Sequence, residues 1–200
     1  MKTFLKILGV IIVLFIAIPL IFALFMEKEY KVSREVLIKK PVEQVFDYVK
    51  YLKHQKEYSV WQKMDPDQHH TYNGEDGTVG FVSTWDSQNP DVGRGQQTIV
   101  SMVEGQRIDY EIQFFEPFEA KDNAFMETKP VSENQTAVVW GFEGKMPYPM
   151  NLLLPLMNME EMLGEQLQTG LNNLKKVLEA RVEKENNEID TIEKQGLEVE

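Results

Sequence analysis

The sequence predicts an α+β fold in which a long C-terminal helix covers an antiparallel β-sheet, preceded by one transmembrane helix. Three observations support this prediction. Residues 7–26 are an uncharged apolar run, alternating polar and apolar segments fill the middle of the chain, and leucines recur every three or four residues near its end. Strands followed by a helix are typical of α+β domains, because the helix covers the apolar face of the sheet.

The chain has 200 residues and is expected to hold one globular domain between two segments of different composition. A domain of about 155 residues buries roughly two-thirds of its surface on folding, which is enough for a stable core and leaves scope for an internal cavity. We expect a short N-terminal segment at 1–6, a transmembrane helix at 7–26, the domain at 27–182 and an acidic flexible tail at 183–200.

Charge and composition exclude several classes of function. The net charge is −11 and no basic patch is visible, whereas nucleic-acid binding that is independent of sequence requires cations to neutralise phosphates. The chain contains no cysteine, which excludes disulfides, thiolate catalysis and zinc held by cysteine. Because of the negative charge and the lack of a basic patch, we expect no nucleic-acid partner.

The apolar run at 7–26 is long enough to cross a bilayer, since a helix of this length spans about 30 Å. The alternative is a cleaved signal peptide, but its apolar region is usually about 7–15 residues long and precedes a small-x-small site. Ile21-Phe22-Ala23 fits such a site poorly, so we expect residues 7–26 to hold the protein in the membrane. Lys2 and Lys6 favour an extracytoplasmic domain, whereas the basic residues between 28 and 40 act against it. Since those later residues also belong to the first strand of the domain, we expect the domain on the extracytoplasmic side.

The domain is expected to open with a strand at 30–40, followed by a helix that begins at Pro41 and a second short helix within 51–61. About six strands follow, and Glu104-Gly105-Gln106 is a hairpin signal between two of them. Val79, Phe81 and Trp85 are expected on one face of their strand. The strands are expected at 70–74, 78–85, 95–103, 107–115, 122–129 and 135–145.

A long amphipathic helix is expected to close the domain. Its apolar residues recur at helical spacing over about six turns and form one stripe, which we expect to face the sheet. The acidic residues after 183 contain too few apolar side chains to bury much surface, which predicts the flexible tail. The stripe consists of Leu156, Met159, Leu163, Leu167, Leu171, Leu174 and Leu178.

Four segments of the chain resemble the START/Bet v1-like (SRPBCC) superfamily, in its polyketide cyclase/dehydrase-like branch. They are IKKPVEQVFDYVKYLKHQKEYSVW, VGFVSTWDSQNPDVGRGQQTIVSMVEGQRIDYEIQFFEPF, TAVVWGFEGKMP and MEEMLGEQLQTGLNNLKKVL, the last with Gly164 and Gly170 placed as in that branch. They occur in the superfamily's order, and the resemblance covers about residues 30–180. The resemblance implies a helix-grip fold, in which a curved antiparallel β-sheet is wrapped around a long C-terminal helix. Many members of the superfamily bind lipids, hormones or other apolar molecules between sheet and helix.

Inward-facing aromatic and methionine residues are the candidate lining of such a cavity. Apolar pockets with a few placed polar groups are typical of small-molecule sites, and methionine adapts to irregular ligands. The alternative is a solid core, because stripes of this kind usually only bury surface. The candidates are Trp61 at the mouth and, further in, Trp85, Met102, Tyr110, Trp140, Phe142, Met159 and Leu163.

Catalytic and metal-binding signals are weak. Asp109 and Glu111 alternate with Tyr110 and are expected to face solvent, whereas Glu127 and Glu143 are not assigned to a face. The G-x-S-x-G nucleophile elbow is absent, and no spacing typical of metal ligands surrounds the two adjacent histidines at 69 and 70. We therefore expect no catalytic residues, no metal site and no cofactor.

The leading hypothesis is a membrane-anchored START-like domain that binds a hydrophobic or amphipathic small molecule, such as a lipid or a polyketide-like compound. A second hypothesis is a cyclase or dehydratase that uses the same cavity, and it requires a buried carboxylate or histidine pointing inward. A third is an interaction module similar to the cochaperone relatives of the superfamily. It requires a filled interior and an exposed apolar patch. Oligomeric state and ligand identity stay open.

Overall fold

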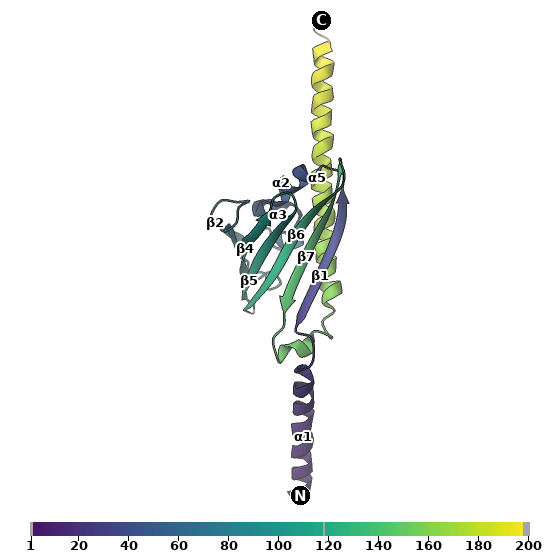
Figure 1. The fold of residues 1–200 in the computed structure, drawn as a ribbon. Helices are drawn as coiled ribbons and strands as arrows, with labels where there is room; N and C mark the ends of the chain where they lie inside the picture. Colours follow the sequence, from purple (N-terminus) through teal and green to yellow (C-terminus); the bar gives the residue numbers. More distant parts are fainter. Residues whose placement is uncertain (1, 118, 198–200) are drawn as a thin grey trace.

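The computed structural model describes residues 2–117 and 119–197. Figure 1 shows a sheet with helix α5 running along one of its faces, and helix α1 projecting from one end of the molecule. The helices are α1 (Lys2–Ala23), α2 (Val42–Val49), α3 (Gln55–Tyr58), α4 (Val60–Met64) and α5 (Met159–Leu197), with 3-10 turns η1 (Leu52–His54) and η2 (Met150–Leu153).

All seven strands pair antiparallel in the order β1-β7-β6-β5-β4-β3-β2. The predicted architecture is therefore confirmed: an antiparallel sheet around a C-terminal helix, with an apolar helix in front. The strands are β1 (Glu29–Ile38), β2 (His69–Asn73), β3 (Val82–Asp86), β4 (Arg94–Val103), β5 (Arg107–Glu116), β6 (Ala120–Ser132) and β7 (Gln135–Lys145).

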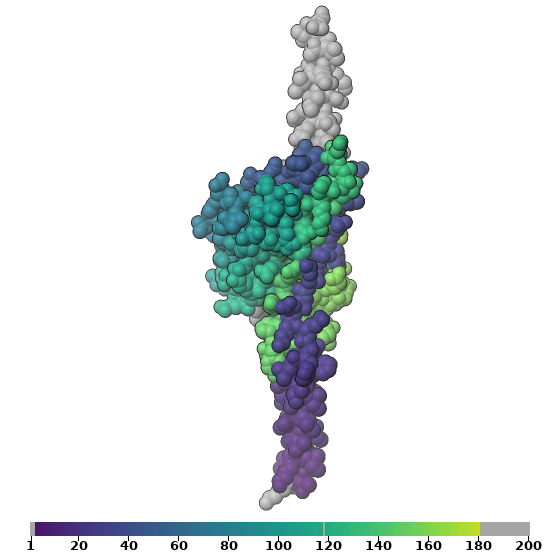
Figure 2. Space-filling view, viewed as in Figure 1, coloured from purple at the N-terminus to yellow at the C-terminus, as the bar shows by residue number. Residues whose placement is uncertain are grey.

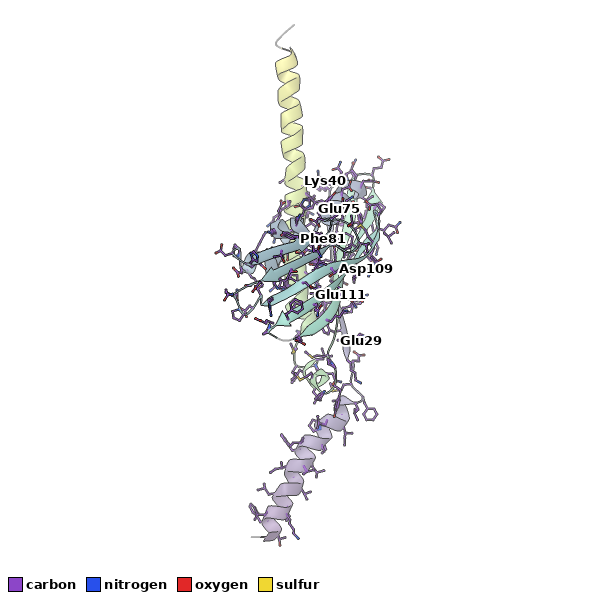
Figure 3. All side chains as sticks on the ribbon, turned by 90° about the vertical axis from the view of Figure 1, so that its left-hand side faces the viewer. Glu29, Lys40, Glu75, Phe81, Asp109 and Glu111 are labelled. Atoms are coloured by element: carbon purple, nitrogen blue, oxygen red, sulfur yellow. The ribbon has the colours of Figure 1, made fainter. Side chains whose placement is uncertain are left out.

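The sheet has a basal end, defined as the end at which β1 starts at Glu29 shortly after α1. Pairing places Lys145 of β7 opposite Glu29, and Glu116 of β5 opposite Arg94 of β4. The loops between β3 and β4 and between β5 and β6 therefore lie at the basal end. Figure 3 shows Glu29 at this end and Lys40 at the opposite, distal end.

Helix α1 is long and apolar enough to cross a membrane over Thr3–Ala23. This span begins earlier and ends earlier than the predicted range of 7–26, and Leu24, Phe25 and Met26 lie in the turn that follows it. The end of the helix is fixed by tertiary structure. The buried side-chain amide of Asn151 donates a hydrogen bond of 2.7 Å to the carbonyl of Ala23. Such a bond satisfies one of the carbonyls that every helix leaves free at its C-terminus.

Helix α5 packs its leucine stripe against the sheet, and the leucines from Leu167 to Leu178 are 0–3% exposed. Leu156 does not belong to this stripe, contrary to the prediction. It lies before the helix, which begins at Met159, and is 80% exposed. The helix continues to Leu197, so the structure has a helix where the composition predicted a flexible tail; residues 198–200 lie outside the described residues.

The third strand is shorter than predicted because its first residues form a turn. Gly80 has a φ of +93°, in the left-handed region that favours glycine, and β3 begins only at Val82. Phe81 is 1% exposed, as expected of a residue facing the core, but Val79 lies in the turn and is 58% exposed. The expectation that Val79 shares the face of Phe81 and Trp85 is therefore wrong.

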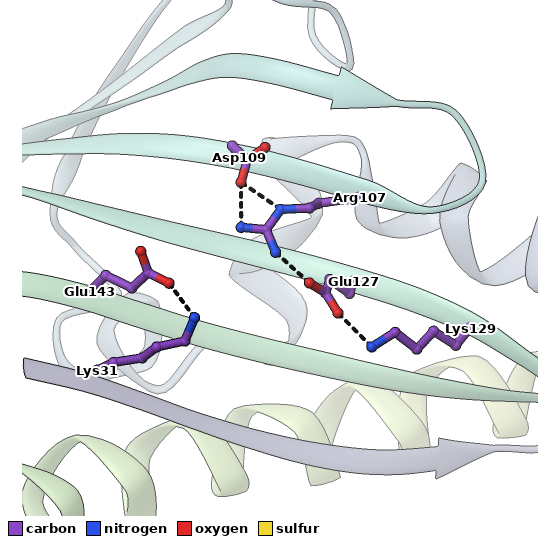
Figure 4. A network of polar contacts seen from close by, with 6 residues as sticks. All are labelled: Lys31, Arg107, Asp109, Glu127, Lys129 and Glu143. Atoms are coloured by element: carbon purple, nitrogen blue, oxygen red, sulfur yellow. Dashed lines mark hydrogen bonds and ion pairs between the residues drawn. The ribbon is translucent and has the colours of Figure 1, made fainter.

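Ion pairs cover the outer face of the sheet, which is the face away from α5. Figure 4 shows Arg107 bridging Asp109 and Glu127, with Lys129 on Glu127 and Lys31 on Glu143. Exposed pairs of this kind add little stability, but they keep the outer face polar. Asp109 faces outward as predicted, and Figure 3 shows Glu111 on the same strand. The cavity described below lies on the opposite, inner face.

Two glycines of α5 let the helix approach the sheet. A Cβ added at Gly170 would lie 2.7 Å from Cζ3 of the Trp140 ring, whereas one added at Gly164 would meet the guanidinium of Arg34. The ring is held in the core, but the guanidinium ends a flexible side chain that can move. The two positions therefore differ in how well they tolerate a side chain.

We expect Gly170→Ala to destabilise the protein and Gly164→Ala to leave its stability unchanged or raise it. Overpacking costs about 1–3 kcal/mol, which exceeds the ~1 kcal/mol that alanine gains over glycine within a helix. Denaturant unfolding of the full chain in detergent micelles measures both free energies. Equal effects from the two variants would contradict the close packing of Gly170 on Trp140.

Candidate functional site

A cavity of about 280 Å³ lies between the sheet, helix α4 and helix α5. Its walls come from the basal ends of the strands, such as Phe114 near the end of β5 and Ala124 near the start of β6. Leu163 and Leu167 of α5 close the opposite side. The volume is near the lower limit for small-molecule sites, which hold about 300–1,000 Å³.

Five of the eight predicted residues line this cavity. Trp61, which was expected at the mouth of the cavity, comes from α4. The other four come from strands and from α5. The sequence contains three tryptophans, and all three line the cavity. The five residues are Trp61, Trp85, Trp140, Phe142 and Leu163.

The other three predicted residues lie elsewhere. Tyr110 is fully buried in the packed core, and Met102 packs against that core near the distal end of β4. Met159 lines a separate groove near the end of α1, together with Tyr30 and Leu154. These residues do face inward, but helix α2 and neighbouring side chains fill the distal half of the space between sheet and helix. The cavity is left in the basal half.

Aromatic rings form the wall by edge-to-face contacts. The centroid of Trp140 lies 5.8 Å from that of Trp61 and 5.7 Å from that of Tyr58. Trp85 meets Phe114 in the same way at 5.9 Å, and its indole N–H donates to the carbonyl of Val92, 3.3 Å away. This bond ties the ring to the loop between β3 and β4. Aromatic pairs of this geometry add stability beyond the area they bury, so these contacts stabilise the wall.

Several polar residues also line the cavity, and the sequence analysis missed them. Ser83 and Gln97 have the same strand parity as Trp85 and Ile99, so alternation alone was a sufficient signal for these two. The glutamines at 55, 62 and 68 come from short helices and a loop, where no such period exists. Their presence depends on tertiary folding.

Two of these glutamines carry buried polar atoms without a hydrogen-bond partner among the described residues: Nε2 of Gln55 and Oε1 of Gln62. Leaving such an atom unpaired in the interior costs about 1–3 kcal/mol. Gln68 differs, because its Nε2 donates to the carbonyls of Asp65 at 2.9 Å and Gln62 at 3.2 Å and holds the end of α4. The unpaired amides therefore supply hydrogen-bonding capacity in a largely apolar site.

Charged groups are scarce at the cavity. Among the described residues that line it, Asp91 is the single ionisable side chain. Burial raises the pKa of Tyr58, which packs behind Trp140, well above its ordinary value, so its hydroxyl is neutral at physiological pH. Glu127 and Glu143, which the sequence did not assign, point to the outer face through their ion pairs. Among the described residues, no cluster of His, Asp and Glu is arranged to hold a metal ion.

Residues 29–179 match the family described as "Polyketide cyclase / dehydrase and lipid transport". The chain belongs to this family. The resemblance to the SRPBCC superfamily inferred from four sequence segments is therefore confirmed, and the matched region extends from the first strand into helix α5. None of the curated proteins compared with this chain matches it by sequence.

Solved structures share the fold of this family member at low sequence identity. A Thermobifida fusca protein solved by NMR is 19% identical, with a TM-score of 0.54 over 74% of this chain and 92% of its own. A Thalictrum flavum norcoclaurine synthase mutant, in complex with a transition-state analogue, is 8% identical, with a TM-score of 0.56 over 76% and 96%. StfQ, a di-domain ARO/CYC of the steffimycin biosynthetic pathway, is 12% identical, with a TM-score of 0.58 over 78% and 52%. At these identities the likeness shows the fold alone.

Proposed function

We propose that the protein is a membrane-anchored domain that binds an uncharged apolar or amphipathic small molecule in the basal cavity. The cavity itself is the observation on which this proposal depends. It is walled by three tryptophans, and it contains two glutamine amide atoms that have no hydrogen-bond partner among the described residues. Transfer of apolar surface into it supplies about 25 cal/mol per Å² buried, before the costs of association.

The polar lining favours an uncharged ligand. Its groups are glutamine amides and serine hydroxyls, which hydrogen-bond to hydroxyl, carbonyl or amide groups. A carboxylate or phosphate would need a cation or several donors to offset its desolvation, and Asp91 would repel it. The volume of about 280 Å³ suits one compact ring system or a single chain better than a lipid with two acyl chains.

The cavity favours ligand binding over the two alternatives. A cochaperone-like module requires a filled interior, whereas this interior keeps open space beside Trp140. A cyclase or dehydratase requires titratable groups that point at the substrate, and Asp91 is the one such group among the described lining residues. Ligand binding, unlike catalysis, requires no titratable group in the cavity.

The joint between α1 and the domain supports an uncleaved anchor over a cleaved signal. Ala23 is fully buried, and its carbonyl accepts the hydrogen bond from Asn151. Removal of residues up to Ala23 would leave the buried amide of Asn151 without its shortest hydrogen bond. We expect the mature chain to retain α1 and to resist extraction from membranes by alkaline carbonate; a shortened, extractable chain would contradict the anchor.

Two dyes with one aromatic skeleton test the preference for an uncharged ligand. N-phenyl-1-naphthylamine is neutral, and 1-anilinonaphthalene-8-sulfonate adds one sulfonate. We expect the neutral dye to quench the tryptophan fluorescence of the full chain in detergent micelles at lower concentration, because all the tryptophans line the cavity. Equal or tighter binding of the sulfonate would contradict an uncharged ligand.

A cavity-filling variant tests where the dye binds. Ala124 lines the cavity and is 3% exposed, so Ala124→Phe places a ring in the open space. We expect this variant to lose the response to the neutral dye and to keep its folded structure by circular dichroism. Asp109→Ala, on the outer face, is the matched control and should bind as the unaltered protein does. Unchanged binding by Ala124→Phe would place the dye outside the cavity.

A further inference from the structure

The segment between the last strand and α5 forms an exposed apolar surface at the base of the domain. Residues 146–159 carry no charge, and they lie between Lys145 and Glu160. We call the four large exposed side chains of this segment the basal collar. The basal collar consists of Tyr148, Met150, Leu153 and Leu156.

The basal collar is fixed beside the end of α1. Asn151, within η2, donates to the carbonyl of Ala23 at 2.7 Å and to that of Met26 at 3.4 Å. Figure 2 shows the green segment around residue 150 against the top of α1. Leu24 and Phe25, in the turn that follows α1, are also exposed, so large exposed apolar side chains occur both at the end of the span and in the collar.

Length and charge indicate where a membrane would end. A helix over Thr3–Ala23 spans about 31 Å, which matches the hydrocarbon core of a bilayer. The collar then lies at the boundary between acyl chains and headgroups. The ion pair between Lys145 and Glu29, 2.7 Å long, lies just beyond it, where charged groups can stay hydrated.

We infer that the basal collar inserts into the interface of the bilayer spanned by α1 and holds the basal cavity against the lipid surface. This inference depends on the proposed anchoring by α1. Exposed leucine and methionine side chains gain free energy when they leave water for the interface, and uncharged Tyr148 is of the type enriched there. Groups of exposed apolar side chains of this kind commonly mark surfaces that contact proteins or membranes.

The position of the cavity gives the collar a role in ligand uptake. Val92 and Asp91 line the cavity from the loop between β3 and β4, and that loop lies at the basal end. Leu163, on the other wall, lies about one helical turn along α5 from the end of the collar segment at Met159. A neutral amphiphile dissolved in the bilayer therefore reaches the cavity over a short path. A ligand that arrives from bulk water must instead dissolve in water first, which an apolar molecule does poorly.

Fluorescent labels at two exposed positions test the insertion in the full chain. The sequence has no cysteine, so Leu156→Cys and Val131→Cys each provide one site for an environment-sensitive fluorophore. Val131 is 54% exposed and lies in the β6–β7 hairpin at the distal end. We expect spin-labelled lipid in phosphatidylcholine nanodiscs to quench the label at 156 and not the label at 131.

The opposite pattern overturns the inference. Quenching of the label at 156 by aqueous iodide, to the same extent as at 131, would place the basal collar in water. Protection from both quenchers would mean that protein covers the collar, either a second copy or another partner. Because the readout needs no ligand, failure of ligand binding leaves it intact, and the two proposals fail separately.

The kinetics of uptake test the consequence. We expect Leu156→Glu to slow transfer of the neutral dye from phosphatidylcholine vesicles to the protein several-fold, with its equilibrium affinity unchanged, because Leu156 is 80% exposed and does not line the cavity. A charged substitution at Leu171 could not test uptake, because Leu171 is buried in the core and the variant would be destabilised. An unchanged transfer rate would contradict uptake through the collar-facing side.

Discussion

Trp140→Ala is expected to lower the free energy of unfolding by about 3–5 kcal/mol, the usual cost of removing a large aromatic side chain from a core. Trp140 is 5% exposed and holds edge-to-face contacts with Tyr58 and Trp61. The variant also loses the ring that fits against Gly170 of α5. Denaturant unfolding of the full chain, followed by circular dichroism, measures the change.

The same variant is expected to weaken binding of the neutral dye, because Trp140 is part of the cavity wall. Binding is compared at denaturant concentrations where the variant is shown to be folded. Asp109→Ala removes an ion pair on the outer face and should change stability by less than about 1 kcal/mol and leave binding unaltered. Equal losses from the two variants would contradict the assignment of inner and outer faces.

A pair of leucine variants distinguishes the buried leucine stripe of α5 from the exposed basal collar that precedes the helix. Leu171 is fully buried and Leu156 is 80% exposed, although both fit the same helical period in the sequence. We expect Leu171→Ala to cost about 2–5 kcal/mol of folding stability, because it leaves a cavity between α5 and the sheet. Leu156→Ala should change stability by no more than about 0.5 kcal/mol.

The measurement is denaturant unfolding in detergent micelles, monitored by the tryptophans that line the cavity. The sheet grips α5 through its leucines, so a small effect at Leu171 would mean that the helix docks elsewhere. A large effect at Leu156 would instead show that the basal collar packs on protein in solution.

The sequence predicted which side chains face the interior of the domain, but not which of them line the cavity. Alternation along β5 and β7 assigns Tyr110, Trp140 and Phe142 to the inner face, and all three are buried. Alternation contains no information on how α2 fills the space above them, so Tyr110 was expected at the cavity and instead lies in solid core. Alternation also assigns Ser83 and Gln97 to the inner face, although hydrophobicity does not mark them as cavity residues because they are polar.

Periodicity by itself determined the fold class, the order of the elements and the apolar helix, because these depend on local spacing that any close-packed arrangement must satisfy. The resemblance of four sequence segments, rather than periodicity, indicated the family over about residues 30–180. Tertiary structure decided the rest: the end of α1 at the amide of Asn151, the exposure of Leu156, and the unpaired glutamines of the cavity. Each of these is set by contacts between residues far apart in the chain, which no local pattern encodes.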